Sequence, residues 1–153
     1  MDLILWRHAE AQDEAPDGDD LQRALTGRGE KQAARVATWL DRQLPEGTRI
    51  LSSPALRCEQ TAIALGRKFK VRNELAPEAT VNDILEAAQW PDSRQPVLIV
   101  GHQPVLGETI AHLMGLNQPS CPVRKGAVWW FRTRERDGHG QTILVAVQAP
   151  ETV

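Results

Sequence analysis

Cationic and imidazole side chains follow the first apolar run of the chain. Residues 3–6 read Leu-Ile-Leu-Trp, and Arg7 and His8 come directly after them. The apolar run is typical of a buried strand. A guanidinium and an imidazole are costly to bury without partners. We therefore expect both groups to lie at the strand's end, where they could bind an anion.

Two further strand candidates lead into groups of the same kind. Residues 49–52 form a short strand candidate, and Arg57 follows about one helical turn later. Residues 97–100 are apolar throughout, and His102 comes two residues after them. Because ligands of open α/β sheets bind beyond the carboxyl ends of the strands, we expect these groups to lie together with the first pair.

The expected cluster of Arg7, His8, Arg57 and His102 has the composition of an anion site. Two guanidinium charges repel each other in an empty pocket. A planar guanidinium pair suits the oxygens of a phosphoryl group best. Helix N-termini expected nearby would add free N–H groups and positive dipole ends. The sequence therefore predicts a phosphoryl-binding site.

The elements that must position this cluster alternate between strands and helices. Helical periodicity predicts a first helix capped by Thr26 and running to about Leu44, and a second capped by Ser53 with an inner stripe reaching Phe69. A third helix is expected over 81–90. A fourth should begin at Gln103-Pro104 and bury Leu106, Ile110, Leu113 and Met114. Further strands are expected over 71–75, 127–133 and 142–148, the last two joined through Asp137-Gly138, and a flexible segment over 13–20. The pattern predicts one three-layer α/β/α domain over residues 1–153, with a mostly parallel central sheet and an antiparallel edge.

Composition narrows the classes of partner. The 153 residues are 41% hydrophobic and 25% charged, with a net charge of -2, which argues against a broad nucleic-acid surface. The apolar runs are too short for a signal peptide or a membrane span. We therefore expect a cytoplasmic protein with no nucleic-acid or membrane partner. Cys58 and Cys121 lack metal-ligand spacing, so we expect reduced thiols and no metal site.

Three motifs carry a family resemblance. Residues 5–10 (LWRHAE) resemble the L-x-RHG/RHA signature of the histidine phosphatase (phosphoglycerate mutase-like) superfamily, with Ala9 in place of the commoner glycine. Residues 52–61 (SSPALRCEQT) resemble its S-S-P-x-x-R-x-x-Q-T motif, and residues 100–102 (VGH) its V-x/G-H motif. The short chain and residues 20–26 (DLQRALT), which resemble a D-x-x-R-x-L-T element, favour the SixA-type phosphohistidine phosphatases.

The resemblance implies a role for each matching residue. His8 is implied as the nucleophile that becomes transiently phosphorylated, with Arg7 and Arg57 binding the phosphoryl oxygens. His102 is implied to stabilise negative charge on those oxygens, and Arg23 to supply a third cation. The chemistry needs no metal and no cofactor, because phosphoryl transfer depends mostly on positioning and charge stabilisation. The implied partners are a phosphohistidine-carrying protein and inorganic phosphate or its analogues.

Two other functions stay open at this stage: a small-molecule phosphomonoesterase, and a non-catalytic module that binds phosphohistidine. We find no E-x-x-F-G-x-W-E-G segment, which supplies the acid of many relatives. Glu10, Asp20 and Glu78 are the nearest carboxylates and have ordinary interpretations as loop residues. We expect Cys58 to serve packing, and His112 and His139 to lie on the surface. Lys125 and the Trp129-Trp130 pair are left without a role.

Overall fold

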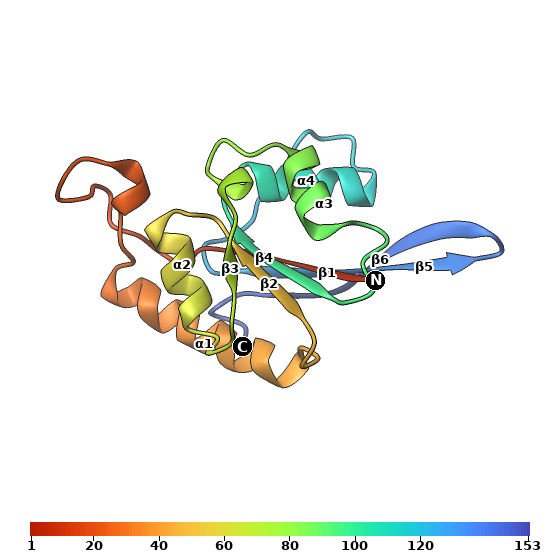
Figure 1. Cartoon of the computed structure of the whole chain (residues 1–153), viewed down its shortest axis with the longest axis horizontal. Coiled ribbons are helices and arrows are strands. Elements are labelled where there is room, and N and C mark those ends of the chain that lie inside the picture. The colour runs from red at the N-terminus through yellow and green to blue at the C-terminus, as the bar shows by residue number, and fades with distance from the viewer.

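A computed structural model describes all 153 residues and has an α/β fold (Figure 1). The strands are β1 (Asp2–Arg7), β2 (Arg49–Ser52), β3 (Lys70–Val71), β4 (Val97–Gly101), β5 (Val128–Arg136) and β6 (His139–Gln148). The helices are α1 (Gly27–Gln43), α2 (Leu56–Ile63), α3 (Val81–Ala88) and α4 (Val105–Met114), with single 3-10 turns at Asp20–Gln22 and Asn73–Leu75.

The six strands form one mixed sheet in the order β3-β2-β4-β1-β5-β6. Strands β1 to β4 pair in parallel, whereas β5 lies antiparallel to β1 and β6 antiparallel to β5. The mostly parallel sheet with an antiparallel edge, predicted from the sequence, is therefore confirmed. Strand β4 is buried along its whole length, which explains its continuous apolar run.

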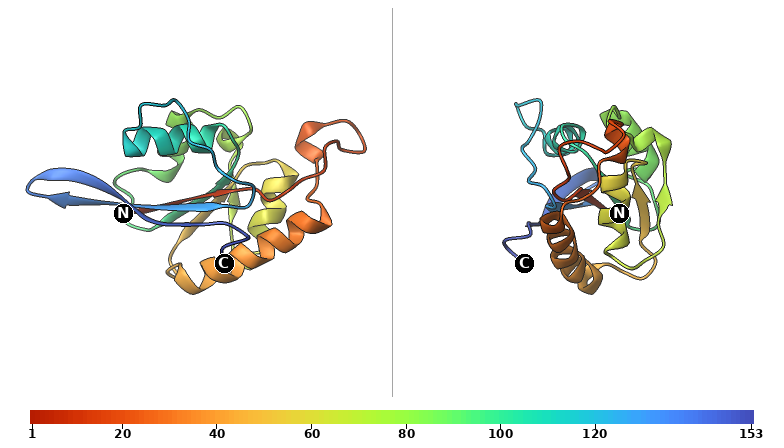
Figure 2. Two further views of the ribbon diagram at one scale, coloured as in Figure 1. Left: turned by 180° about the vertical axis from the view of Figure 1, so that it is seen from behind. Right: turned by 90° about the vertical axis from the view of Figure 1, so that its left-hand side faces the viewer.

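Two helices cover each face of the sheet (Figures 1 and 2). Helices α1 and α2 lie against one face, where the core includes Trp6, Leu40 and Val100. Helices α3 and α4 lie against the other, where the core includes Leu5 and Ile99. The alternation of side chains along β1 and β4 supplies both cores. These layers are the three predicted from the sequence.

The register of the central strands brings three chain segments to the same edge. Arg7 at the end of β1 is level with Gly101 at the end of β4, and Ser52 at the end of β2 is level with Val100. The residues that follow each strand therefore leave the sheet side by side. Their backbones are tied together, because His8 N–H donates to Gly101 O at 3.1 Å.

The second helix is shorter than predicted and starts later. Helix α2 begins at Leu56 with Ala55 as its N-cap, so Ser53 does not cap it. The helix ends at Ile63, and Gly66 follows with a φ of +72° that few other residues adopt. The inner stripe predicted to reach Phe69 therefore stops early. The strand predicted over 71–75 is likewise reduced to Lys70–Val71 and a 3-10 turn.

Other boundaries differ in detail. The helix predicted over 81–90 ends at Ala88, because Gln89 adopts a left-handed conformation. Met114, predicted inside α4, is 44% exposed at the last turn of that helix. The β5–β6 hairpin is longer than predicted, although its turn lies at Asp137-Gly138 as expected.

The segment over 13–20, for which the sequence predicts flexibility, forms local hydrogen bonds. An Asp17 carboxylate oxygen accepts a hydrogen bond from Asp19 N–H at 3.0 Å. The Asp19 carboxylate in turn caps the 3-10 turn at Asp20–Gln22 by accepting from Leu21 N–H at 3.1 Å. In the whole chain, no helix has the length and apolar character needed to cross a membrane.

Candidate active site

His8 lies directly after β1 and is 7% exposed. Its Nδ1 is 2.7 Å from the carbonyl oxygen of Ala9. Because a carbonyl only accepts hydrogen bonds, Nδ1 carries the ring proton and Nε2 keeps its lone pair. Burial, helped by Arg57 and Arg7, lowers the pKa of His8 from 6.5 to about 4. The imidazole is therefore neutral at physiological pH, as a nucleophile must be.

His102 follows β4 and lies beside His8, with ring centroids 5.4 Å apart and planes at 60°. Its side chain is 2% exposed. Burial lowers its pKa to about 3, with further contributions from His8 and Arg57. This ring is therefore also neutral at physiological pH and can offer an N–H dipole but no full charge.

Ser53 contacts His102 directly, a role that the sequence interpretation missed. The Ser53 hydroxyl is 2.7 Å from His102 Nε2 and accepts from Ala55 N–H at 3.2 Å. The side chain is fully buried, so this hydrogen bond is not shared with solvent. Ser53 therefore fixes the ring of His102. The signal was present in the second motif, where Ser53 was interpreted only as a helix cap.

One nitrogen of the Arg7 guanidinium, Nη1, is hydrogen-bonded, whereas another, Nε, is not. Its Nη1 donates to Val123 O at 2.7 Å, which ties the end of β1 to the loop before β5. Its Nε is buried and has no hydrogen-bond partner. An unpartnered buried donor is uncommon and calls for an explanation.

Arg57 repeats this arrangement from helix α2 and is 3% exposed. Its Nη1 donates to the backbone oxygen of Asp20 at 2.8 Å, and its Nη2 to the Asp20 carboxylate at 3.1 Å. Its Nε is buried without a partner. The Nε atoms of Arg7 and Arg57 are the two buried side-chain polar atoms that lack a partner in this chain. A bound anion that reached both Nε atoms would satisfy them.

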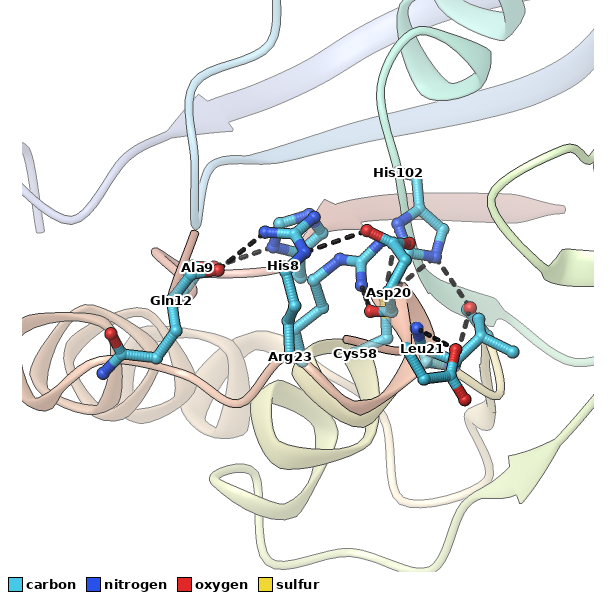
Figure 3. Close-up of polar contacts among 12 residues, drawn as sticks. His8, Ala9, Gln12, Asp20, Leu21, Arg23, Cys58 and His102 are labelled. Carbon is cyan, nitrogen blue, oxygen red and sulfur yellow. Dashed lines mark hydrogen bonds and ion pairs between the residues drawn. The ribbon is translucent and has the colours of Figure 1, made fainter. Parts of the chain in front are cut away.

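Arg23 reaches the same cluster through Asp20. Its Nε donates to the Asp20 carboxylate at 2.9 Å, and its Nη1 to Gln12 O at 2.8 Å (Figure 3). The structure thus brings together all five residues predicted for the site, which are Arg7, His8, Arg23, Arg57 and His102.

Two other residues of the second motif hold the neighbouring loops in place. The Thr61 hydroxyl accepts from Ala9 N–H at 3.1 Å and donates to Arg57 O at 2.8 Å. The Gln60 side-chain oxygen accepts from Leu25 N–H at 2.7 Å. Helix α2 therefore fixes both the segment after β1 and the segment that carries Arg23.

None of the three carboxyl groups considered from the sequence, which are Glu10, Asp20 and Glu78, is placed and protonated as a proton donor beside His8. The Glu10 carboxylate accepts from the Thr26 hydroxyl at 2.7 Å, which commits it to the start of α1. Glu78 is exposed on the loop between the second 3-10 turn and α3. The Asp20 carboxyl has a pKa below its usual value because Arg23 and Arg57 donate to it, so it stays ionised.

The remaining polar candidates lie outside the cluster or are inert. Cys58 Sγ is 3.4 Å from His102 Nε2, but burial raises the pKa of the thiol to about 12, so it is not a thiolate. His112, His139 and Lys125 are exposed. Trp130 packs edge-on against Trp39 of α1, while Trp129 stacks on Phe131 on the other face of the sheet.

The chain also matches known proteins over the segments that build this site. A sequence model of the histidine phosphatase superfamily (branch 1) matches residues 3–80, just over half of the chain. The chain belongs to the histidine phosphatase superfamily. It is therefore a phosphatase, and the resemblance found in the motifs is confirmed.

Relatives of this histidine phosphatase carry the SixA name. The chain is 30% identical to a phosphohistidine phosphatase SixA homolog of Haemophilus influenzae, over 98% of this chain and 97% of the relative. It superimposes on a structure of the protein histidine phosphatase SixA complexed with tungstate, with a TM-score of 0.76 and 26% identity over 98% of this chain and 97% of that one. A putative SixA from Agrobacterium tumefaciens gives a TM-score of 0.81 at 26% identity, covering 97% of each chain.

Proposed function

We propose that this phosphatase removes the phosphoryl group from phosphohistidine on a carrier protein, through a covalent phosphohistidine intermediate at His8. One observation carries the proposal: a neutral imidazole with a free Nε2 shares a buried cluster with two guanidinium Nε atoms that lack partners. The names of the SixA relatives and the tungstate complex of one of them support the same substrate class.

The reaction proceeds in two displacements. His8 Nε2 attacks phosphorus, so a P–Nε2 bond forms while the P–N bond of the substrate phosphohistidine breaks. The leaving imidazole takes up a proton from solvent. A water molecule then attacks the phosphorylated His8, releasing inorganic phosphate and restoring the free imidazole. Splitting one hydrolysis into two substitutions lowers the barrier of each.

The surrounding groups stabilise the negative charge of the transferring phosphoryl group. Arg7 and Arg57 direct Nε–H donors at its oxygens, and His102 donates from a ring that Ser53 holds in place. These donors are buried before the substrate arrives, so little reorganisation is needed during the reaction. No metal ion is needed for this step, because the two guanidinium groups neutralise the developing charge.

The chemistry of the leaving group favours phosphohistidine over an alkyl phosphate. Imidazole has a pKa of about 6.5 and leaves readily at neutral pH. An alkoxide is about as basic as hydroxide and needs a positioned proton donor, since the pKa of water is roughly 15.7. Glu10 and Asp20 are both committed to other partners and cannot supply that proton.

A panel of substrates tests the proposal. We expect rapid turnover of a phosphohistidine peptide, slower turnover of the activated aryl ester para-nitrophenyl phosphate, and little turnover of phosphoserine. His8→Ala should abolish all three activities, whereas His112→Ala, which removes an exposed imidazole of α4, should leave them unchanged. Efficient hydrolysis of phosphoserine would favour the phosphomonoesterase instead. Binding of phosphohistidine without turnover would favour the non-catalytic module.

A further inference from the structure

The proposed phosphoryl site already holds an anion that belongs to the chain. One oxygen of the Asp20 carboxylate accepts from Arg57 Nη2 at 3.1 Å, and the other from Arg23 Nε at 2.9 Å. A single carboxylate thus bridges two of the guanidinium groups assigned to the phosphoryl group (Figure 3). The backbone oxygen of Asp20 also accepts from Arg57 Nη1. Asp20 therefore occupies the outer side of Arg57.

The groups beneath Asp20 are almost closed to solvent, whereas Asp20 itself is not. His8, Arg57 and His102 are 7%, 3% and 2% exposed. The Asp20 side chain is 60% exposed. It lies in a three-residue 3-10 turn that contains no buried residue, on a loop that extends away from the sheet (red in Figure 1). Moving the Asp20 side chain alone breaks two ion pairs at an exposed carboxylate and no buried apolar contact, so its displacement costs little packing energy.

The donors for which a carboxylate and a phosphoryl group would compete are Nη2 of Arg57 and Nε of Arg23, both held by Asp20. Both anions present paired oxygens to the planar fork of an arginine. Asp20 is ionised at neutral pH, because Arg23 and Arg57 donate to its carboxylate. Since Asp20 is tethered beside the site, its effective concentration is high. An incoming anion must therefore bind Arg57 and Arg23 more strongly than a single carboxylate does.

We propose that Asp20 is a specificity-determining residue, an internal competitor that a phosphoryl dianion must displace from Arg57 and Arg23. The inference rests on the proposed function, because it assigns the same two arginines to the phosphoryl group. A phosphoryl dianion brings a larger charge and three oxygens, and it also reaches the unpartnered Nε atoms of Arg7 and Arg57. A monoanion such as acetate gains too little to displace Asp20 and is excluded.

Calorimetric titration with inorganic phosphate tests this competition. Asp20→Asn removes the charge of the competitor with a near-isosteric side chain, and Asp20→Ser removes the carboxylate altogether. We expect both variants to bind phosphate about threefold more tightly than the original chain, because phosphate then no longer has to break the ion pairs of a charged carboxylate. Both variants should also bind acetate measurably, which the original chain should not.

Asp13→Asn is the matched control, because it removes one charge from the same loop at an exposed residue outside the arginine cluster. Its phosphate affinity should stay within about twofold of the original, because Asp13 is exposed and forms no ion pair with these arginines, and salt screens charges in water. Unchanged or weaker binding in the Asp20 variants would overturn the inference, because Asp20 would then serve to orient Arg57. An equal increase of phosphate affinity in Asp13→Asn would also overturn it, because a non-specific change in the charge of the loop would then explain the result. If phosphate bound to none of the four proteins, the proposed function would fail as well.

Discussion

Burial is the main reason why His8 and His102 are neutral at physiological pH. The lowered pKa values of His8 and His102 arise first from desolvation and then from the nearby guanidinium charges. In the proposed mechanism, the cations that bind the phosphoryl group therefore also keep His8 unprotonated. The hydrogen bond from His8 Nδ1 to Ala9 O opposes this effect, but it also leaves Nε2 as the nitrogen with a free lone pair.

These pKa values predict how the two rings respond to pH. A histidine whose pKa is lowered stays neutral as the pH falls through 6.5, the usual pKa of histidine. His8 should therefore become protonated only near pH 4. NMR titration of the imidazole C–H signals should show no change for His8 and His102 between pH 8 and 5.5, while added N-acetylhistidine titrates at about 6.5. A midpoint above pH 6 for His8 would contradict the neutral nucleophile.

Ser53 offers a second test at a single side chain. Ser53→Ala removes the hydrogen bond to His102 Nε2 and leaves that buried nitrogen with only the weaker contact to Cys58 Sγ. We expect kcat on a phosphohistidine peptide to fall by about tenfold, the cost of one buried hydrogen bond, with a smaller change in KM. Ser52→Ala is the matched control, because the neighbouring hydroxyl is equally buried but donates to Ser53 O instead. Equal losses in the two variants would point to a structural effect alone.

The strand ends were predictable because apolar runs and turns are local signals. The buried β1 and β4 are short apolar runs, and both end at the polar residues that the site uses. The contacts between distant segments were not predictable in the same way. Ser53 meets His102 across 49 positions and Arg57 meets Asp20 across 37, and neither pairing leaves a periodic trace in the sequence.

Helix ends were predicted less well than helix positions, since a single residue can stop a helix that the periodicity would continue. Gln89 ends α3 in a left-handed conformation although its residue type gives little warning. The length of α2 was overestimated for a similar reason, because apolar residues continue past Ile63 while the backbone turns at Gly66.

The start of α1 packs against the segment that follows His8, and a glycine makes this possible. A Cβ atom at Gly29 would lie 2.0 Å from the backbone oxygen of Glu10, whereas one at Gly27 would meet nothing within 4 Å. Gly29→Ala should therefore lower the free energy of unfolding by about 1–3 kcal/mol and reduce activity. Gly27→Ala, in the first turn of the same helix, should change it by less than about 1 kcal/mol. Urea titration measures both, and equal stability of the two variants would contradict this packing.

In the whole molecule, the sheet serves as a rigid frame whose carboxyl edge gathers residues from four separate segments. Arg7 ends β1 and His8 follows it, Arg57 comes from α2, His102 follows β4, and Asp20 lies in the segment before α1. We propose that residues 1–153 act as one domain, since each of these segments depends on the same sheet. The proposed phosphatase site is then formed at the carboxyl edge of the sheet by several segments together, and not by any single helix or strand.

The most direct test is to capture the phosphorylated enzyme. Mixing the protein with a ³²P-phosphohistidine peptide and quenching in alkali after milliseconds should leave label on the protein, in a form that is stable to base and labile to acid. Peptide mapping should place that label on His8, and His8→Ala should remain unlabelled while His112→Ala labels normally. Label on any other residue, or turnover in His8→Ala above a tenth of the original rate, would contradict covalent catalysis at His8.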